Sequence, residues 1–197
     1  EQFGHSMKEI ILIGGGGHSK SVIDVIEQEG QFKIVGIIDN AELFENNILG
    51  YPIIGNDLDL EDLAKKYPYA LVTIGQIKSP KPRKKLFDLA KKAGFILPSI
   101  VSPLAYVSKH AFIGNGVVVM HGAIINANVS IGDNCIINSK ALIEHDSKVG
   151  EHCHISTNIT INGGVIIESG CFIGSGAILR ESITINKNTF IKAGSIV

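Results

Sequence analysis

Residues 119–154 read VMHGAI-INANVS-IGDNCI-INSKAL-IEHDSK-VGEHCH when they are written in groups of six. Every group begins with isoleucine or valine, and stepping by six from Val101 to Val197 meets 17 aliphatic residues without an exception. Neither the 3.6-residue period of a helix nor the two-residue period of a plain strand produces this spacing. The stretch therefore indicates a repeat architecture that fills residues 101–197.

A second column of residues lies four positions after each aliphatic residue, and its members are mostly small. One large and one small inward side chain in every six residues fit a narrow, triangular, parallel β-helix. Three groups of six would make one coil of 18 residues, so sixteen full groups predict about five coils. At an inter-strand spacing of ~4.8 Å, the coils would stack into a prism roughly 25 Å long.

The three cysteines fall in this second column, at Cys135, Cys153 and Cys171, and each lies 18 residues from the next. We expect them to stack inside the β-helix as small apolar side chains. A redox or metal cluster is the alternative interpretation, but the inward column and the odd number of cysteines favour a structural role.

Residues 7–100 lack the repeat of six and alternate apolar strands with amphipathic helices. This order predicts a small, parallel, Rossmann-like α/β domain that precedes the β-helix of residues 101–197. The expected strands cover 8–13, 33–38 and 70–74, and the expected helices cover 19–29, 60–67 and 83–93.

Composition excludes several classes of function. The net charge of −1 gives no reason to expect a nucleic acid or membrane partner. No apolar run approaches the ~18 residues of a transmembrane helix, and no signal peptide follows Met7, so we expect a cytoplasmic protein. We interpret residues 1–6, which precede Met7, as the remnant of an expression tag.

A run of four glycines, Gly14 to Gly17, followed by His18, separates the first predicted strand from its helix. A helix N-terminus preceded by glycines can meet phosphate closely. Asp39 ends the second strand, where a carboxylate can bind ribose hydroxyls. Because Ser19 replaces the third glycine of the dinucleotide fingerprint and the domain is short, we favour a nucleotide-sugar diphosphate over NAD. The alternative is a tight turn without a ligand.

His145 is flanked by Glu144 and Asp146, and its place in the group of six puts it outward at a corner of the prism. A neighbouring carboxylate orients an imidazole and stabilises its cationic form, which makes it a better base. The alternative is an exposed histidine beside acids that are there by chance.

The remaining histidines of the repeat are also expected on the outside. His121 occupies the same position as His145 but one coil below, on a neighbouring corner, and His154 projects from a wall. We expect His110 and His152 to be solvated exterior residues.

The glycine loop with His18, then Asp39, Gly75 and the repeat with Ile143-Glu144-His145-Asp146 at its middle resemble the sialic-acid O-acetyltransferase and amino-sugar N-acetyltransferase family. The resemblance covers the chain from Met7 onward. It implies a left-handed β-helix of hexapeptide repeats, acetyl-CoA as co-substrate and no metal. It also implies a homotrimer with active sites between adjacent β-helices.

The resemblance further implies roles for individual residues. His145 would be the general base, and Asp146 would raise its basicity. Acetyl-CoA would meet His154 and run along a groove lined by backbone near Ser175 and Ala193. The nucleotide sugar would be held by Gly16, Gly17, His18, Asp39, Asn40 and Gly75.

Two departures from the family pattern bear on the nucleotide contacts. Ser19-Lys20 stands where the family loop often has a small residue followed by glycine. Asn40 stands where some sugar N-acetyltransferases have a second aspartate.

We therefore predict an acetyltransferase that N-acetylates a UDP-linked 4-amino sugar in bacterial glycan biosynthesis by direct transfer. O-acetylation of a sialic-acid-like sugar is one alternative. A second is a β-helical carbonic anhydrase with zinc between subunits, held by His121, His145 and His154. A third is a nucleotide-sugar-binding scaffold without chemistry. The outward apolar residues expected to be buried in the trimer are Ile124, Ile136, Ile166 and Ile178.

Overall fold

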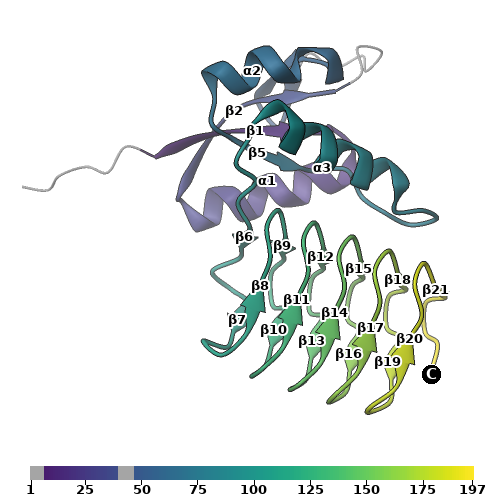
Figure 1. Ribbon diagram of the computed structural model, residues 1–197. Helices are drawn as coiled ribbons and strands as arrows, with labels where there is room; N and C mark the ends of the chain where they lie inside the picture. The colour runs from purple at the N-terminus through teal and green to yellow at the C-terminus, as the bar shows by residue number, and fades with distance from the viewer. Residues whose placement is uncertain (1–6, 40–46) are drawn as a thin grey trace, which may run out of the picture.

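The computed structural model describes residues 7–39 and 47–197. An α/β domain precedes a left-handed parallel β-helix and lies along one side of it (Figure 1). The first strand of the β-helix, β6, begins at Ile100, so we place the division between the two parts at about residue 100.

The α/β domain has a five-stranded sheet in the order β3-β4-β2-β1-β5. All neighbouring strands are parallel except β3 and β4, which are antiparallel. The sequence did not predict β3 or β4, which are a two-residue strand and a Pro-containing strand near the edge of the sheet. The strands are β1 (Lys8–Ile13), β2 (Phe32–Ile38), β3 (Asn47–Ile48), β4 (Tyr51–Gly55) and β5 (Tyr69–Val72).

Alternate residues of the interior strand β1 face opposite layers, as the two-residue period of a strand requires. Ile10 and Leu12 contact the layer that contains α1, whereas Ile11 and Ile13 face the layer that contains α2 and α3. Both faces are covered over Ile10–Ile13, so this part of the strand is continuously apolar. The helices are α1 (Gly17–Glu29), α2 (Leu60–Lys66) and α3 (Lys81–Ala93), with a 3₁₀ turn η1 (Asp57–Asp59) before α2.

The β-helix has three parallel sheets, and each strand pairs with the strand 18 residues later, for example Ile125 with Ile143. The first wall contains β6 (Ile100–Val101), β9 (Val118–Val119), β12 (Ile136–Ile137), β15 (His154–Ile155), β18 (Phe172–Ile173) and β21 (Phe190–Ile191). The second wall contains β7 (Tyr106–Val107), β10 (Ile124–Ile125), β13 (Leu142–Ile143), β16 (Thr160–Ile161) and β19 (Ile178–Leu179). The third wall contains β8 (Phe112–Ile113), β11 (Ser130–Ile131), β14 (Lys148–Val149), β17 (Ile166–Ile167) and β20 (Thr184–Ile185).

Both inward columns expected from the repeat form the core of the β-helix. The three cysteines lie within it as free, fully buried thiols, as predicted. From the turn after β8 onward, each turn between walls contains a residue with a left-handed backbone conformation, mostly asparagine or glycine, and these residue types adopt it at the lowest cost.

The first wall corrects two expectations. Ile136 is fully buried and His152 is 7% exposed, because the α/β domain covers this wall and Phe87 of α3 contacts the His152 ring. Ile136 is therefore not available to a neighbouring subunit, and His152 is not solvated. Repeat counting identified both as exterior to the β-helix, but it carries no information about what covers a wall.

Ile124, Ile166 and Ile178 are 39–42% exposed on the other two walls. Within residues 7–39 and 47–197, no helix is both long and apolar enough to cross a membrane.

Candidate active site

His145 lies in the turn between β13 and β14, at the corner between the second and third walls. Its side chain is 65% exposed, and its Nδ1 lies 2.7 Å from Oδ2 of Asp146. Asp146 has a left-handed backbone (φ 63°), as do the residues at the same position of the neighbouring turns. The ring therefore projects from the prism while the next residue in the chain holds its Nδ1.

Asn128, one coil earlier, extends this contact into a relay. Its amide donates to the other carboxylate oxygen of Asp146 at 2.7 Å. The hydrogen bond from Asn128, followed by that from His145, lowers the pKa of Asp146, so the carboxylate remains ionised. The hydrogen bond to Asp146, together with the charges of Asp146 and Glu144, raises the pKa of His145 against a weaker opposing effect of desolvation.

Gly163 lies one coil after His145, and its backbone approaches the His145 ring closely. A Cβ atom added at Gly163 would lie 2.8 Å from both Cε1 and Nε2 of His145, too close for the ring to stay where it is. The Gly163 carbonyl accepts from the Ser182 amide, whereas its own amide makes no hydrogen bond to another described residue. Sequence reasoning missed Gly163, although the 18-residue spacing from His145 would have located it.

Ser175 and Ala193 lie together on a different corner, between the first and second walls. The Gly176 amide donates to Thr157 and the Gly194 amide donates to Ser175, so this corner is a stacked column with one residue per coil. Both Ser175 and Ala193 are exposed. Within one chain, the structure therefore does not bring the expected acetyl-CoA groove to His145.

The glycine loop meets Asp39 at the carboxyl end of the sheet. The Gly15 amide donates to Asp39 Oδ2 at 2.5 Å, and an added Cβ at Gly15 would lie 2.7 Å from the same oxygen. Gly16 is the N-cap of α1 and Gly17 its first residue, and both are exposed. The predicted pair of loop and carboxylate is thus one structural unit, whereas Asn40 lies outside the described residues.

His18 and Gly75 are neighbours at this edge, since an added Cβ at Gly75 would lie 3.6 Å from Cβ of His18. Burial, with a smaller contribution from the charge of Arg83, lowers the pKa of His18 to about 3. Its Nε2 atom is buried without a hydrogen-bond partner among the described residues. His18 is therefore a neutral imidazole at neutral pH.

His154 lies on the first wall beneath the α/β domain and is 6% exposed. Its Nδ1 donates to the Gln76 carbonyl oxygen at 2.5 Å, so its Nε2 accepts from the Asn138 amide at 3.1 Å. Burial lowers the pKa of His154 to about 4. Both ring nitrogens are thus occupied in this structure.

Arg83 is a second residue that sequence reasoning missed, and it joins the two parts of the chain. Its guanidinium is fully buried and donates to the carbonyl oxygens of Val72 and Ile74 at the end of β5 and of Asn134 in the β-helix. Burial lowers the pKa of Arg83 to about 10, so it remains charged. The sequence indicated only a basic helix here, because a surface lysine and a buried arginine look alike in a pattern.

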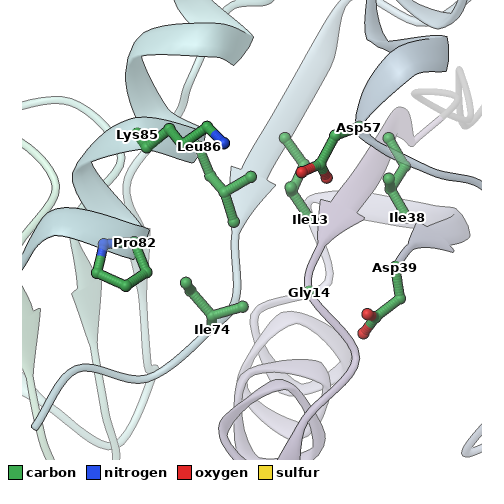
Figure 2. Close-up of a pocket in the computed structure, with 9 residues that line it drawn as sticks. All are labelled: Ile13, Gly14, Ile38, Asp39, Asp57, Ile74, Pro82, Lys85 and Leu86. Atoms are coloured by element: carbon green, nitrogen blue, oxygen red, sulfur yellow. The ribbon is translucent and has the colours of Figure 1, made fainter. Parts of the chain in front are cut away.

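A pocket of about 250 Å³ opens at the carboxyl edge of the sheet, between η1 and α3 (Figure 2). Asp39 lies at its rim, Ile13 and Ile38 form its base, and Leu86 faces them from α3. The pocket and the glycine loop lie at the carboxyl ends of the neighbouring strands β1 and β5. The chain leaves β1 toward α1 on one face of the sheet and leaves β5 toward α3 on the other. Ligands of open α/β sheets bind at such switch points.

Two family models match this chain: the PglD N-terminal domain over residues 9–89, and the bacterial transferase hexapeptide (six repeats) over residues 110–145. A UDP-N-acetylbacillosamine N-acetyltransferase from Bacillus subtilis is 32% identical over 115 residues, which cover 58% of this chain and about half (52%) of that relative.

The chain resembles solved structures of other proteins over almost its whole length. A perosamine N-acetyltransferase from Caulobacter crescentus, in complex with CoA and GDP-perosamine, is 35% identical with a TM-score of 0.90, covering 98% of this chain and 89% of the other. The chain belongs to this family of nucleotide-sugar N-acetyltransferases. The acetyltransferase domain of PglB from Neisseria gonorrhoeae, in complex with acetyl coenzyme A, is 29% identical with a TM-score of 0.89, covering 98% and 91%.

The carbonic anhydrase alternative assigned zinc to His121, His145 and His154. These three histidines lie apart in the structure. His121 is held on the first–second corner by Ser102 at 2.6 Å and by Asp24 at 2.7 Å. His154 is buried on the first wall, and His145 is exposed on the second–third corner. The carbonic anhydrase alternative needs all three at one shared surface, which the burial of His154 opposes.

Proposed function

We propose that the chain transfers an acetyl group from acetyl-CoA to the amine of a nucleotide-linked sugar, with His145 as the general base. The observation that carries the proposal is the relay from Asn128 through Asp146 to His145 at an exposed corner of the β-helix. An ionised carboxylate on Nδ1 leaves Nε2 as the free acceptor of a proton.

The proposed reaction is a direct transfer. His145 Nε2 takes a proton from the sugar amine as the nitrogen attacks the thioester carbonyl carbon. The amide of Gly163, which has no hydrogen-bond partner among the described residues, donates to the oxyanion that forms. Collapse of the tetrahedral intermediate breaks the carbon–sulfur bond, and the departing thiolate takes the proton from His145.

A covalent acetyl-cysteine route does not suit these thiols. All three cysteines are fully buried in the β-helix. The hydrogen bond from Cys135 raises the pKa of Cys153, and that from Cys153 raises the pKa of Cys171. A thiol that resists ionisation and cannot reach the substrate is a poor nucleophile.

We propose that the complete site forms between subunits of a homotrimer. Ser175 and Ala193 lie on one corner and His145 on another, so one chain cannot supply both parts of the site. Ile124 and Ile178 leave the second wall partly apolar, and burying such surface is favourable at ~25 cal/mol per Å². Sedimentation at micromolar concentration should show a trimer, and a stable monomer would refute the shared site.

The α/β domain is proposed to hold the nucleotide sugar through the glycine loop, His18, Asp39 and Gly75, while acetyl-CoA occupies the groove near Ser175 and Ala193. A contact between acetyl-CoA and His154, implied by resemblance, stays a prediction. The UDP-linked sugar expected from the sequence also stays a prediction, because the relatives' names include both UDP- and GDP-linked sugars.

The test is release of CoA thiol from acetyl-CoA in the presence of UDP- and GDP-linked 4-amino sugars, CMP-sialic acid and free sialic acid. We expect turnover with a nucleotide-linked amino sugar and a product that survives hydroxylamine, because an amide resists it and an ester does not. A hydroxylamine-labile product would favour O-acetylation. No turnover with any acceptor, together with intact nucleotide binding, would favour the scaffold alternative.

A further inference from the structure

We propose that the pocket between η1 and α3 binds the nucleobase of the nucleotide sugar and selects guanine over uracil through Asp57. The inference rests on the proposed function for the class of ligand, a sugar nucleotide, and goes beyond it by assigning the base. It replaces the expectation of uracil with one that depends on the chemistry of this pocket.

The pocket has apolar side chains on two sides, as a base that stacks between them requires. Its volume of about 250 Å³ lies between buried Ile13 and Ile38 on one side and half-buried Ile74 and Leu86 on the other. The Asp39 amide donates to the Gly55 carbonyl oxygen at 3.1 Å, which places the start of η1 beside the end of β2. A base in this pocket would therefore lie next to Asp39, the residue expected to hold the ribose.

Two opposite charges reach into the pocket from its two sides. Asp57 extends from η1 and Lys85 from α3, and their charged ends point toward each other across the opening (Figure 2). They do not form an ion pair, and neither side chain has a hydrogen bond to another described residue. Asp57 is half-buried, and its carboxylate can accept hydrogen bonds from donors on a ligand.

The Lys85 ammonium can donate a hydrogen bond and the Asp57 carboxylate can accept two. The hydrogen-bonding edge of guanine complements this pair better than that of any other base. Guanine presents an acceptor, O6, followed by two donors, N1–H and N2–H₂, and a carboxylate accepts both donors in a bidentate pair. Adenine and cytosine present a donor where Lys85 needs an acceptor. They also present an acceptor where Asp57 needs a donor.

Uracil fits only in part. Its O4 and N3–H can face Lys85 and Asp57, but its O2 then lies against the second carboxylate oxygen. Uracil O2 and this carboxylate oxygen are both acceptors, so they repel each other and neither gains a hydrogen bond. This lowers the affinity for uracil. A well-formed bidentate pair distinguishes bases by roughly 10-fold or more, so we expect GDP to bind about 10-fold more tightly than UDP.

The experiment is calorimetric titration of the full chain with GDP, UDP and XDP. Xanthine is a purine of the same size, but O2 replaces the amino group of guanine. The unmodified protein should bind GDP about 10-fold more tightly than either XDP or UDP. UDP binding as tight as that of GDP would overturn the assignment, and so would XDP binding as tight as that of GDP.

Asp57→Asn should reverse the preference. The asparagine amide accepts from N1–H and donates to O2, so XDP should gain affinity and GDP should lose about 10-fold. The turn should survive, because its capping box is made by Asn56 and Asp59. Asp62→Asn on α2 removes the same charge away from the pocket, and it should leave the order of the three nucleotides unchanged.

Equal loss of GDP, UDP and XDP in Asp57→Asn would place Asp57 on the ribose or phosphates and refute base selection. Binding is measured without acetyl-CoA, so its outcome is separate from the proposed activity. If the three nucleotides bind in the predicted order of affinity but no acetyl group is transferred, the proposed function is refuted and the base assignment stands. No binding of any nucleotide diphosphate would refute the base pocket, even if an acceptor without a nucleotide were acetylated.

Discussion

His145 and His154 belong to neighbouring stretches of one repeat, yet their surroundings give them opposite properties. His145 is 65% exposed at a corner and is hydrogen-bonded to a carboxylate, which raises its pKa. His154 is 6% exposed beneath the α/β domain and is hydrogen-bonded to a carbonyl oxygen, and burial lowers its pKa to about 4. The repeat fixes where a side chain points, whereas the layer above it decides its chemistry.

The largest expected difference between the two positions comes from removing each ring. His145→Ala should lower kcat by about 10² to 10⁴-fold, because a general base contributes that much, and it should leave the thermal midpoint unchanged. His154→Ala should instead destabilise the fold by about 1–3 kcal/mol, because Gln76 and Asn138 lose their buried partner. Steady-state kinetics and thermal unfolding of both variants provide the measurement.

If the two variants lost kcat and thermal stability to the same extent, the distinction between a catalytic His145 and a structural His154 would be wrong. If His145→Ala kept nearly normal kcat, His121 would be the next candidate for the base, because both ring nitrogens of His154 are occupied.

A smaller effect is expected when the ring of His145 is displaced rather than removed. Gly163→Ala places a Cβ atom against the ring, so kcat should fall roughly 10- to 100-fold, as small misplacements of a reacting group do. The double variant with His145→Ala should be no worse than His145→Ala alone. Additive losses in the double variant would show that Gly163 acts independently of the ring.

Asp146→Asn should have a milder effect on rate and a defined effect on pH dependence. The base is active when neutral, so kcat/KM falls as the pH drops through the raised pKa of His145. Removing the carboxylate lowers this pKa, so the acidic limb should move to lower pH, while kcat on the plateau falls about 10-fold. An unmoved limb in the pH–rate profile would separate Asp146 from the titrating base.

The buried histidines should affect stability rather than rate. His18 and His154 have folded-state pKa values of about 3 and about 4, both below the ordinary 6.5, so the unfolded chain binds more protons. Their contribution to stability is complete above about pH 6.5 and is lost as the pH falls through about 4 for His154 and about 3 for His18, so Tm should fall over this range. His154→Gln should flatten this dependence, and an unchanged slope would contradict the burial argument.

The sequence predicted the β-helix closely because its core is local: inward residues recur at a fixed spacing, and each coil repeats the one before. It also predicted β1 exactly as observed over residues 8–13 and placed α1 two residues late. The His145–Asp146 contact was predictable because the two residues are adjacent.

Other features depend on contacts between distant parts of the chain. The burial of Ile136 and His152 follows from docking of the α/β domain, which no repeat encodes. Arg83 bonds to Asn134, 51 residues away, and gave no signal beyond its charge. Gly163 was within reach of the sequence, because its role follows from the 18-residue coil once His145 is chosen as the base.

The most direct test of the central claim, that His145 is the general base, compares two midpoints. NMR titration of the His145 ring gives its pKa in the free enzyme, and the acidic limb of kcat/KM against pH gives the pKa of the catalytic base. The account predicts that the two midpoints coincide and lie above the ordinary histidine value of 6.5. A limb that does not coincide with the His145 titration, or a His145 midpoint below 6.5, would contradict it.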